Sequence, residues 1–308
     1  MKVRSVIIRL TCKALYESLG MDLIVRIARI IFPNYNLNER TGIQEAIPIT
    51  AQMAAEQIVR DMIETGRFYH FIELLISIND QGLMGREYPI SHLREIVKEI
   101  IADGYIFDEE TGLFVENSSC RISPDWGRLL EGEERNLALL RLDIAQNSLL
   151  VKNNPKEAVD SAYESLRLII SHSVLMRSGR VWIWEGDGCL CGFLFGRKER
   201  AAVFASMEIL HELFLYNRLH NPLSSPLQVR VAVHAGPLRY STNPDLLRKN
   251  ETVKEITEIE SMCAPVDGLA VSSHLFISLD RTLQERFKNE VAYDGLKARQ
   301  YSIAVEKL

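Results

Sequence analysis

Two aspartates lie where a predicted strand ends or turns, and both carry carboxylates suited to binding a metal ion. Asp143 ends the apolar strand in RLDIAQNS, residues 141–148, and Asp187 lies in the bend of WEGDGCL, residues 184–190. Mg²⁺ and Mn²⁺ prefer oxygen ligands, usually one or two carboxylates together with substrate phosphates. If the two strands are neighbours, both carboxylates meet at one edge of a sheet, and the pair predicts a two-metal site for phosphate chemistry.

Each aspartate also has an ordinary structural interpretation. Asp187-Gly188 between alternating apolar residues is a common hairpin turn, and Asp143 could simply cap a turn. Taken singly, each residue is more often structural than catalytic. The pair, in this order of elements, favours the metal site.

The elements that must position the two aspartates alternate between strands and helices. A strand is predicted over 137–145, a helix after Pro155, a hairpin over 181–195, a helix over 199–219, a strand over 227–236, a helix over 251–264, a strand over 268–273, then a last helix and a strand over 301–306. This order predicts an α+β fold with a ferredoxin-like βαββαβ-type mixed sheet and covering helices. The preceding half is predicted to be a mostly helical module.

The N-terminal part shows helical periodicity over 12–32, 50–64 and 68–79. The stretch 89–116 then reads as a helix, ended by Gly104, and two short strands around a Glu-Thr-Gly turn, which is the pattern of a winged helix. Such an element is either a DNA reader or a protein-docking or regulatory module. Acidic residues in the helix and hairpin, including Asp108, Glu109 and Glu110, would repel phosphate and favour the second interpretation. We expect domains over 1–125 and 126–308.

The composition is that of an ordinary globular protein. The 308 residues are 47% hydrophobic and 25% charged with a net charge of −5, so nothing global indicates nucleic acid or an anionic membrane surface. Five cysteines without a CxxC pair favour a reducing compartment. The apolar stretch 21–32 contains three charged residues and is too short to span a bilayer. We expect a cytoplasmic protein.

Residues 137–306 resemble the catalytic domain of class III nucleotidyl cyclases. The resemblance rests on LLRLDIAQNS, WEGDGCLCGF, VRVAVHAGPL and IESMCAPVDGLAVSS, and it covers a little over half of the chain. It implies that an NTP is converted to a 3′,5′-cyclic nucleotide and pyrophosphate with two Mg²⁺ or Mn²⁺ ions. It also implies a head-to-tail homodimer with two shared active sites.

The resemblance assigns a role to individual residues. Metal ligands are expected at Asp143, Ile144 and Asp187; substrate-binding residues at Asn147, Ser148, Arg180 and Ile183; and catalytic residues at Asn250, Lys254 and Arg239. The expected partners are the nucleoside triphosphate, a second copy of the chain and a downstream effector that binds the cyclic nucleotide. Neither a membrane nor a nucleic acid is expected.

The late helix departs from the family pattern. Family members carry Asn and Arg one helical turn apart, where this chain has Lys254 and Glu258. A shift by one turn pairs Asn250 with Lys254, which keeps the spacing and restores a cation, although a lysine lacks the fork of an arginine. Arg239 is a further candidate for the polyphosphate. The alternative is that this helix is only a solvated charged surface.

The base-reading position departs as well. Purine cyclases place Lys or Glu four residues before the second metal position, where this chain has Ile183. The chain therefore looks more like the pyrimidine cyclases of bacterial anti-phage (Pycsar) defence, which make cyclic UMP or cyclic CMP. Arg180, Trp182 and Trp184 flank this strand, and hairpin packing is the other explanation for the tryptophans. The rival functions are an adenylate cyclase, a catalytically impaired cyclase-fold regulator that binds nucleotide, and a DNA-binding regulator.

Overall fold

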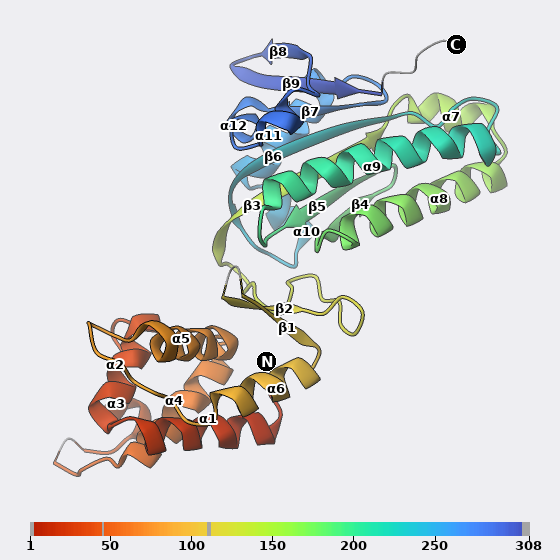
Figure 1. The fold of residues 1–308 in the computed structure, drawn as a ribbon. Helices are drawn as coiled ribbons and strands as arrows, with labels where there is room; N and C mark the ends of the chain where they lie inside the picture. Colours follow the sequence, from red (N-terminus) through yellow and green to blue (C-terminus); the bar gives the residue numbers. More distant parts are fainter. Residues whose placement is uncertain (1–2, 45, 110–111, 304–308) are drawn as a thin grey trace. The chain divides into compact units, whose positions relative to one another are not determined.

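The computed structural model describes residues 3–44, 46–109 and 112–303, and the chain divides into two compact units, Met1–Arg128 and Leu129–Leu308 (Figure 1). The sequence-based boundary was placed at 125/126. Among the described residues, no helix is both long and apolar enough to cross a membrane.

The N-terminal unit is built from helices that end in a β-hairpin. Its elements are α1 (Ser5–Ser18), α2 (Met21–Ile31), α3 (Leu37–Thr41), α4 (Ala51–Glu64), α5 (Phe68–Gln81), α6 (Leu93–Ala102), β1 (Tyr105–Asp108) and β2 (Leu113–Glu116). The helical pattern predicted over 12–32 is present as two helices, because Leu19 and Gly20 are extended and separate α1 from α2. Both helices can then pack their apolar faces on α4.

The helix and hairpin predicted over 89–116 are present as α6, β1 and β2. The strands are antiparallel, with Tyr105 opposite Glu116 and Asp108 opposite Leu113. Glu110 and Thr111 of the predicted turn lie outside the described residues. Buried Glu73 on α5 fastens the hairpin, because its carboxylate accepts a 2.7 Å hydrogen bond from the backbone N–H of Phe114.

The C-terminal unit contains a seven-stranded sheet in the order β4-β5-β3-β6-β7-β9-β8. The strands are β3 (Glu134–Ile144), β4 (Arg180–Glu185), β5 (Gly188–Phe193), β6 (Val229–Arg239), β7 (Gly268–Ser272), β8 (Asn289–Tyr293) and β9 (Leu296–Ser302). The β6–β7 pair is parallel and the other pairs are antiparallel. The prediction of a mixed α+β sheet after a helical module is confirmed.

The helices of this unit are α7 (Asn147–Asn153), α8 (Lys156–Leu175), α9 (Lys198–Leu219), α10 (Pro244–Arg248), α11 (Glu251–Glu258), α12 (Ser273–Ile277) and α13 (Arg281–Gln284). A π-helical turn, η1 (Ile259–Cys263), continues α11, so the helix predicted over 251–264 changes its hydrogen-bonding pattern before it ends. The closing strand predicted over 301–306 overlaps only the last two residues of β9, which begins earlier and forms a hairpin with β8, a strand that was not predicted. Residues 304–306 lie outside the described residues.

The two faces of the sheet differ in character. Leu140, Leu142 and Ile144 of β3 belong to the core under α8 and α9, which run side by side across one face (Figure 1). Because successive strand residues point to opposite faces, Arg141 and Asp143 lie on the other face. There α11 and η1 pack on β6 and β3. Asp143 therefore lies on the face away from the two long helices, whereas Asp187, in the β4–β5 turn, lines a small pocket with residues of α8.

Candidate active site

Asp143 lies in the middle of the sheet, between two partner strands. Its Cα partners are Gly188 on β5 and Arg230 on β6. The Nη2 atom of Arg230 lies 3.3 Å from Oδ2 of Asp143. The register of β3 thus places this carboxylate beside the β4–β5 turn and opposite a guanidinium.

Asp187 occupies the tight turn between β4 and β5. Gly186 has a φ of +47°, which favours glycine. A Cβ at position 188 would lie 2.6 Å from the carbonyl oxygen of Leu142, so Gly188 lets β5 approach β3 closely. The backbone N–H of Ile144 donates to the carbonyl oxygen of Asp187 at 3.2 Å, which ties the turn to the end of β3. The two predicted aspartates are therefore brought together.

The two carboxylates influence each other electrostatically. Burial raises the pKa of Asp143, and the negative charge of Asp187 raises it further, against the opposing effect of Arg230. A divalent cation would relieve this repulsion, so the pair fits a hard cation. The described residues contain no cluster of three or more His, Cys, Asp or Glu side chains suited to hold a metal, so other ligands would have to come from substrate, water or backbone. The Ile144 side chain is buried and offers no ligand atom.

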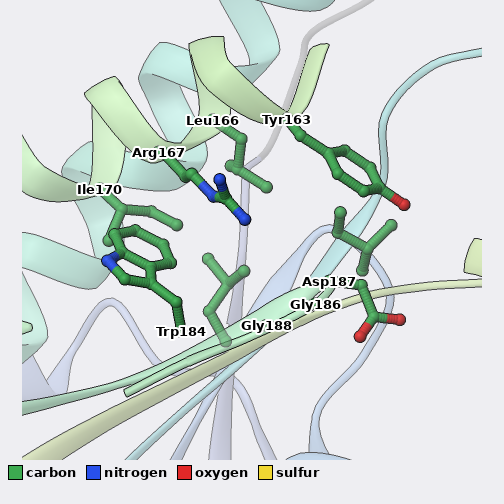
Figure 2. A pocket seen from close by; sticks show the side chains of 10 residues that line it. Tyr163, Leu166, Arg167, Ile170, Trp184, Gly186, Asp187 and Gly188 are labelled. Carbon is green, nitrogen blue, oxygen red and sulfur yellow. The ribbon is translucent and has the colours of Figure 1, made fainter. Parts of the chain in front are cut away.

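Asn147, at the start of α7, is hydrogen-bonded to Asp187. Its Nδ2 donates to Oδ2 of Asp187 at 2.7 Å, and its Oδ1 accepts a hydrogen bond from the hydroxyl of Tyr163 on α8. Figure 2 shows Tyr163 and Asp187 on the same side of a small pocket. Ser148, the neighbouring predicted substrate residue, is exposed. Asn147 therefore contacts a predicted metal ligand and is well placed to orient it.

The tryptophans of β4 have packing roles. Trp182 covers Gly192, where a Cβ would lie 2.6 Å from its ring, and its ring centroid is 5.7 Å from that of Tyr240. The Arg167 guanidinium carbon lies 5.6 Å from the Trp184 ring centroid, on the opposite side of the pocket from Asp187 (Figure 2). These contacts support the packing explanation given by the sequence.

A second cavity, of about 390 Å³, brings Ile183 together with Lys254. We call it the α11 cavity; it is lined by Arg141, Ile183, Glu185, Leu190, Arg248, Val253, Lys254, Thr257 and Glu258. The side chain of Lys254 is half-exposed and forms a 2.6 Å ion pair with Glu251. Two residues that the sequence placed on separate elements, one for the base and one for catalysis, thus line the same cavity.

A chain of ion pairs joins the α11 cavity to Asp143. On the cavity side, Glu185 accepts from Arg248 Nε at 2.7 Å and from Arg141 Nη1 at 3.2 Å. Buried Glu260 of η1 lies between Arg141, at 3.6 Å, and Arg230, at 3.0 Å. Arg230 in turn reaches Asp143, so the network is continuous.

The carboxylates of this network differ in how their surroundings shift the pKa: that of Glu185 is lowered, and those of Glu260 and Asp143 are raised. Burial opposes ionisation of Glu185, yet hydrogen bonds from Arg248 and Arg141 lower its pKa. For Glu260, burial raises the pKa and the charge of Asp143 raises it further. No role was expected from the sequence for Glu185, Glu260, Arg230 or Arg248. The only local signal was charged residues alternating with apolar ones in strands such as 227–236.

The remaining predicted residues lie in structural positions. The Asn250 amide donates to the backbone carbonyls of Arg239, Leu246 and Leu247 at 3.0–3.3 Å and accepts from the N–H of Arg239 at 3.0 Å. It therefore ties the beginning of α11 to the end of β6. Arg239 is exposed there. Arg180 is buried, and its Nη1 donates to the carbonyl oxygen of Gly179 at 2.9 Å.

Comparison with known proteins gives similarity only to solved structures. No protein-family model matches the sequence, and no curated protein does so. A double mutant of the guanylyl cyclase domain of the RhoGC fusion protein from the aquatic fungus Blastocladiella emersonii aligns at 13% identity and a TM-score of 0.47, covering 56% of this chain and 97% of that one. The adenylyl cyclase CyaB from P. aeruginosa aligns at 16% identity and a TM-score of 0.47, covering 58% and 98%.

A third solved structure is the guanylate cyclase domain of RhGC from Catenaria anguillulae in complex with GTP. It aligns at 14% identity and a TM-score of 0.46, covering 57% of this chain and all of that one. At TM-scores below 0.5 these similarities carry no argument about activity.

Proposed function

We propose that the protein is a nucleotidyl cyclase that converts a nucleoside triphosphate into a 3′,5′-cyclic nucleotide and pyrophosphate. The observation that carries the proposal is the pairing of Asp143 and Asp187, which the β3–β5 register and the turn at Gly188 bring together. The α11 cavity, on the same face of the sheet as Asp143, is large enough for a nucleobase.

The reaction exchanges one phosphorus–oxygen bond for another. The ribose 3′-oxygen bonds to the α-phosphorus, its proton is released, and the bond from the α-phosphorus to the leaving pyrophosphate breaks. Asp143, Asp187 and the backbone of Ile144 would hold two Mg²⁺ or Mn²⁺ ions. These ions would neutralise negative charge on the phosphates and favour ionisation of the attacking 3′-hydroxyl. Asn147 holds Asp187 in place through the 2.7 Å hydrogen bond, and Tyr163 holds Asn147.

The cations beyond the carboxylate pair would act on the phosphates. Lys254 on α11 is half-exposed, so its amine is open to a bound polyanion. Arg239 is exposed at the far end of β6, opposite Glu134 and about 30 Å along the strand from Arg230, the partner of Asp143, so within one chain it lies away from the carboxylate pair. Ser148 is exposed beside Asn147 and would contact the substrate there. Asn250 would act indirectly, because its amide holds the backbone between Arg239 and α11. Arg180 is proposed as a support of β4 rather than as a direct ligand.

We propose a pyrimidine substrate, UTP or CTP, in preference to a purine. Ile183 is buried and lines the α11 cavity with an apolar wall, where a purine reader would need a polar group. The protein would then act as a cytoplasmic second-messenger generator in bacterial anti-phage defence, with a cyclic-nucleotide-binding effector downstream. We also propose a homodimer in which the α11 residues of one chain complete the carboxylate site of the other.

Two alternatives are supported by specific observations. A catalytically impaired, nucleotide-binding regulator is favoured by Glu258, an acidic residue in the α11 cavity, and by the engagement of Asp143 with Arg230. An adenylate cyclase is favoured by the polar residues that line the α11 cavity beside the apolar Ile183, because Glu185 and Arg248 carry groups that can hydrogen-bond to a purine edge.

The test is a comparison of four substrates. Purified full-length protein is incubated with equal concentrations of ATP, GTP, UTP and CTP plus Mn²⁺ or Mg²⁺, and the products are identified by mass spectrometry. Cyclic UMP or cyclic CMP as the main product supports the proposal. If cyclic AMP is the main product, the proposed pyrimidine preference is wrong and the adenylate cyclase alternative is supported. If no cyclic product forms at any pH from 6 to 9, cyclase activity is refuted.

A further inference from the structure

We infer that Glu185, together with Arg248 and Arg141, is the group that reads the base in the α11 cavity. The inference rests on the proposed function, because it takes the bound molecule to be a nucleotide. It concerns residues to which neither the sequence pattern nor the family resemblance assigns a role.

The shape of the α11 cavity suits a flat ring with one polar edge. Ile183, Leu190 and Val253 provide apolar walls, while Arg141, Glu185 and Arg248 gather as one polar group. A planar heterocycle can bury its faces against the apolar walls only if its hydrogen-bonding edge meets polar partners. The Glu185–arginine group is such a partner.

The charges of the α11 cavity suit an uncharged base edge at Glu185. The cavity lining has three cationic residues, Arg141, Arg248 and Lys254, and two anionic residues, Glu185 and Glu258, so the net charge is one positive. Both guanidiniums are already hydrogen-bonded to Glu185, which offsets part of their charge. A phosphate placed against the Glu185 carboxylate would be repelled by it, whereas an uncharged base edge would not be. Lys254 is left for the phosphates, as proposed above.

The polar group also has unused hydrogen-bonding capacity. A carboxylate has about four lone-pair positions, and Glu185 uses one oxygen for Arg141 and the other for Arg248, leaving positions for a donor. Arg248 is 46% exposed and donates through Nε to Glu185 and through Nη1 to Asp245, so its other N–H groups can serve an acceptor. The group therefore offers an acceptor and donors side by side.

Adjacent acceptor and donors match the Watson–Crick edge of a base. Uracil would donate its N3–H to Glu185 and accept at a carbonyl from a guanidinium; cytosine would donate its amino group and accept at N3 or O2. The ordering of the group before ligand arrival limits the entropy lost on binding, because the side chains are already hydrogen-bonded to one another. Ile183 then acts only as a wall.

The experiment measures binding rather than turnover. The 3′-deoxynucleoside triphosphates of the four bases lack the attacking hydroxyl, so their dissociation constants can be measured by calorimetry with full-length protein and Mn²⁺. We expect wild type to prefer one base, and the Glu185→Gln variant to lose roughly five- to a hundred-fold in affinity for that base, as expected when one buried hydrogen-bond partner is mismatched. Affinity for inorganic triphosphate should not change.

Two further variants separate recognition from folding. Arg248→Lys keeps the positive charge but loses the guanidinium fork, and it should reduce the preference among bases without lowering the melting temperature. Glu208→Gln is the matched control, because Glu208 forms an ion pair with Arg177 on the α8–α9 side and does not line the α11 cavity. It should leave all four dissociation constants unchanged.

The outcomes distinguish this inference from the proposed function. If base preference falls in the two α11-cavity variants but the four natural triphosphates give no cyclic product, the inference stands and the cyclase proposal fails. If cyclic product forms and the base preference is the same in wild type, Glu185→Gln and Arg248→Lys, the inference is wrong and the cyclase proposal stands. A wild-type protein without base preference, or without nucleotide binding, overturns the inference.

Discussion

Asp143 and Arg230 face each other directly across β3 and β6, and the Nη2 atom of Arg230 lies 3.3 Å from Oδ2 of Asp143. Arg230 also pairs with buried Glu260, so one guanidinium serves two carboxylates. Even so, burial and the nearby charge of Asp187 keep the pKa of Asp143 above its ordinary value. Ionisation of Asp143, which the proposed reaction needs as an anion, therefore lowers the stability of the folded protein.

The raised pKa of Asp143 makes the stability of the protein depend on pH in a definite direction. The pKa of Asp143 is raised in the folded state, so ionisation of this side chain favours unfolding. Its contribution to the free energy of unfolding is therefore lost as the pH rises from the unfolded-state pKa through the folded-state pKa. Asp143→Asn removes this ionisation. We expect the melting temperature of the variant, relative to wild type, to increase between pH 3 and pH 7 in scanning calorimetry without metal. A relative melting temperature that decreases over this range would contradict the direction of the pKa shift.

The carboxylate pair should be essential for turnover but not for folding. Asp143→Asn and Asp187→Asn keep the side-chain shape and remove the negative charge that would bind a cation. We expect cyclic nucleotide formation to fall by roughly a hundredfold or more, while circular dichroism remains that of wild type. Asp22→Asn, an exposed carboxylate on α2, is the control and should retain full activity. Near wild-type rates in either site variant would rule out the two-metal proposal.

Asn147 should matter through Asp187. Asn147→Ala removes the 2.7 Å hydrogen bond to the Asp187 carboxylate, and outer groups that orient a metal ligand typically contribute ten- to a hundred-fold in metal affinity. We expect the dissociation constant for Mn²⁺, measured by electron paramagnetic resonance without nucleotide, to rise by about tenfold. Tyr163→Phe removes only the contact behind Asn147 and should have a smaller effect in the same direction. Unchanged Mn²⁺ affinity in Asn147→Ala would show that this residue does not position the ligand.

Shared sites in a homodimer predict complementation between inactive chains. Asp143→Ala removes a carboxylate, and Lys254→Ala removes a cation from α11, which the proposal places in the partner's site. Co-refolding the two inactive variants should restore up to about a quarter of wild-type activity, because half of the random dimers are mixed and one of their two sites is intact. Complete inactivity of the mixture, with heterodimers present by native mass spectrometry, would exclude a site shared in this way.

Local sequence patterns were sufficient for much of the C-terminal unit. Alternating apolar residues predicted the strand that carries Asp143, and the Asp187-Gly188 dipeptide predicted the hairpin turn. Both features depend on interactions within a few residues, which the sequence displays directly. The pattern was less reliable where tertiary packing decided the ends of elements. The break at Gly20 and the additional strand β8 are examples.

The sequence by itself determined that Asp143 ends a strand and that Asp187 lies in a hairpin turn, because strand alternation and turn chemistry are local properties. Only the tertiary structure decided that these two elements pair, that Arg230 lies opposite Asp143 and that Glu260 lies between two arginines. These residues come from β3, β6 and η1, and which strands pair, and in which register, depends on how the whole sheet buries its apolar faces. The same long-range packing gathers Glu185 and Arg248 in the α11 cavity, 63 residues apart in the chain.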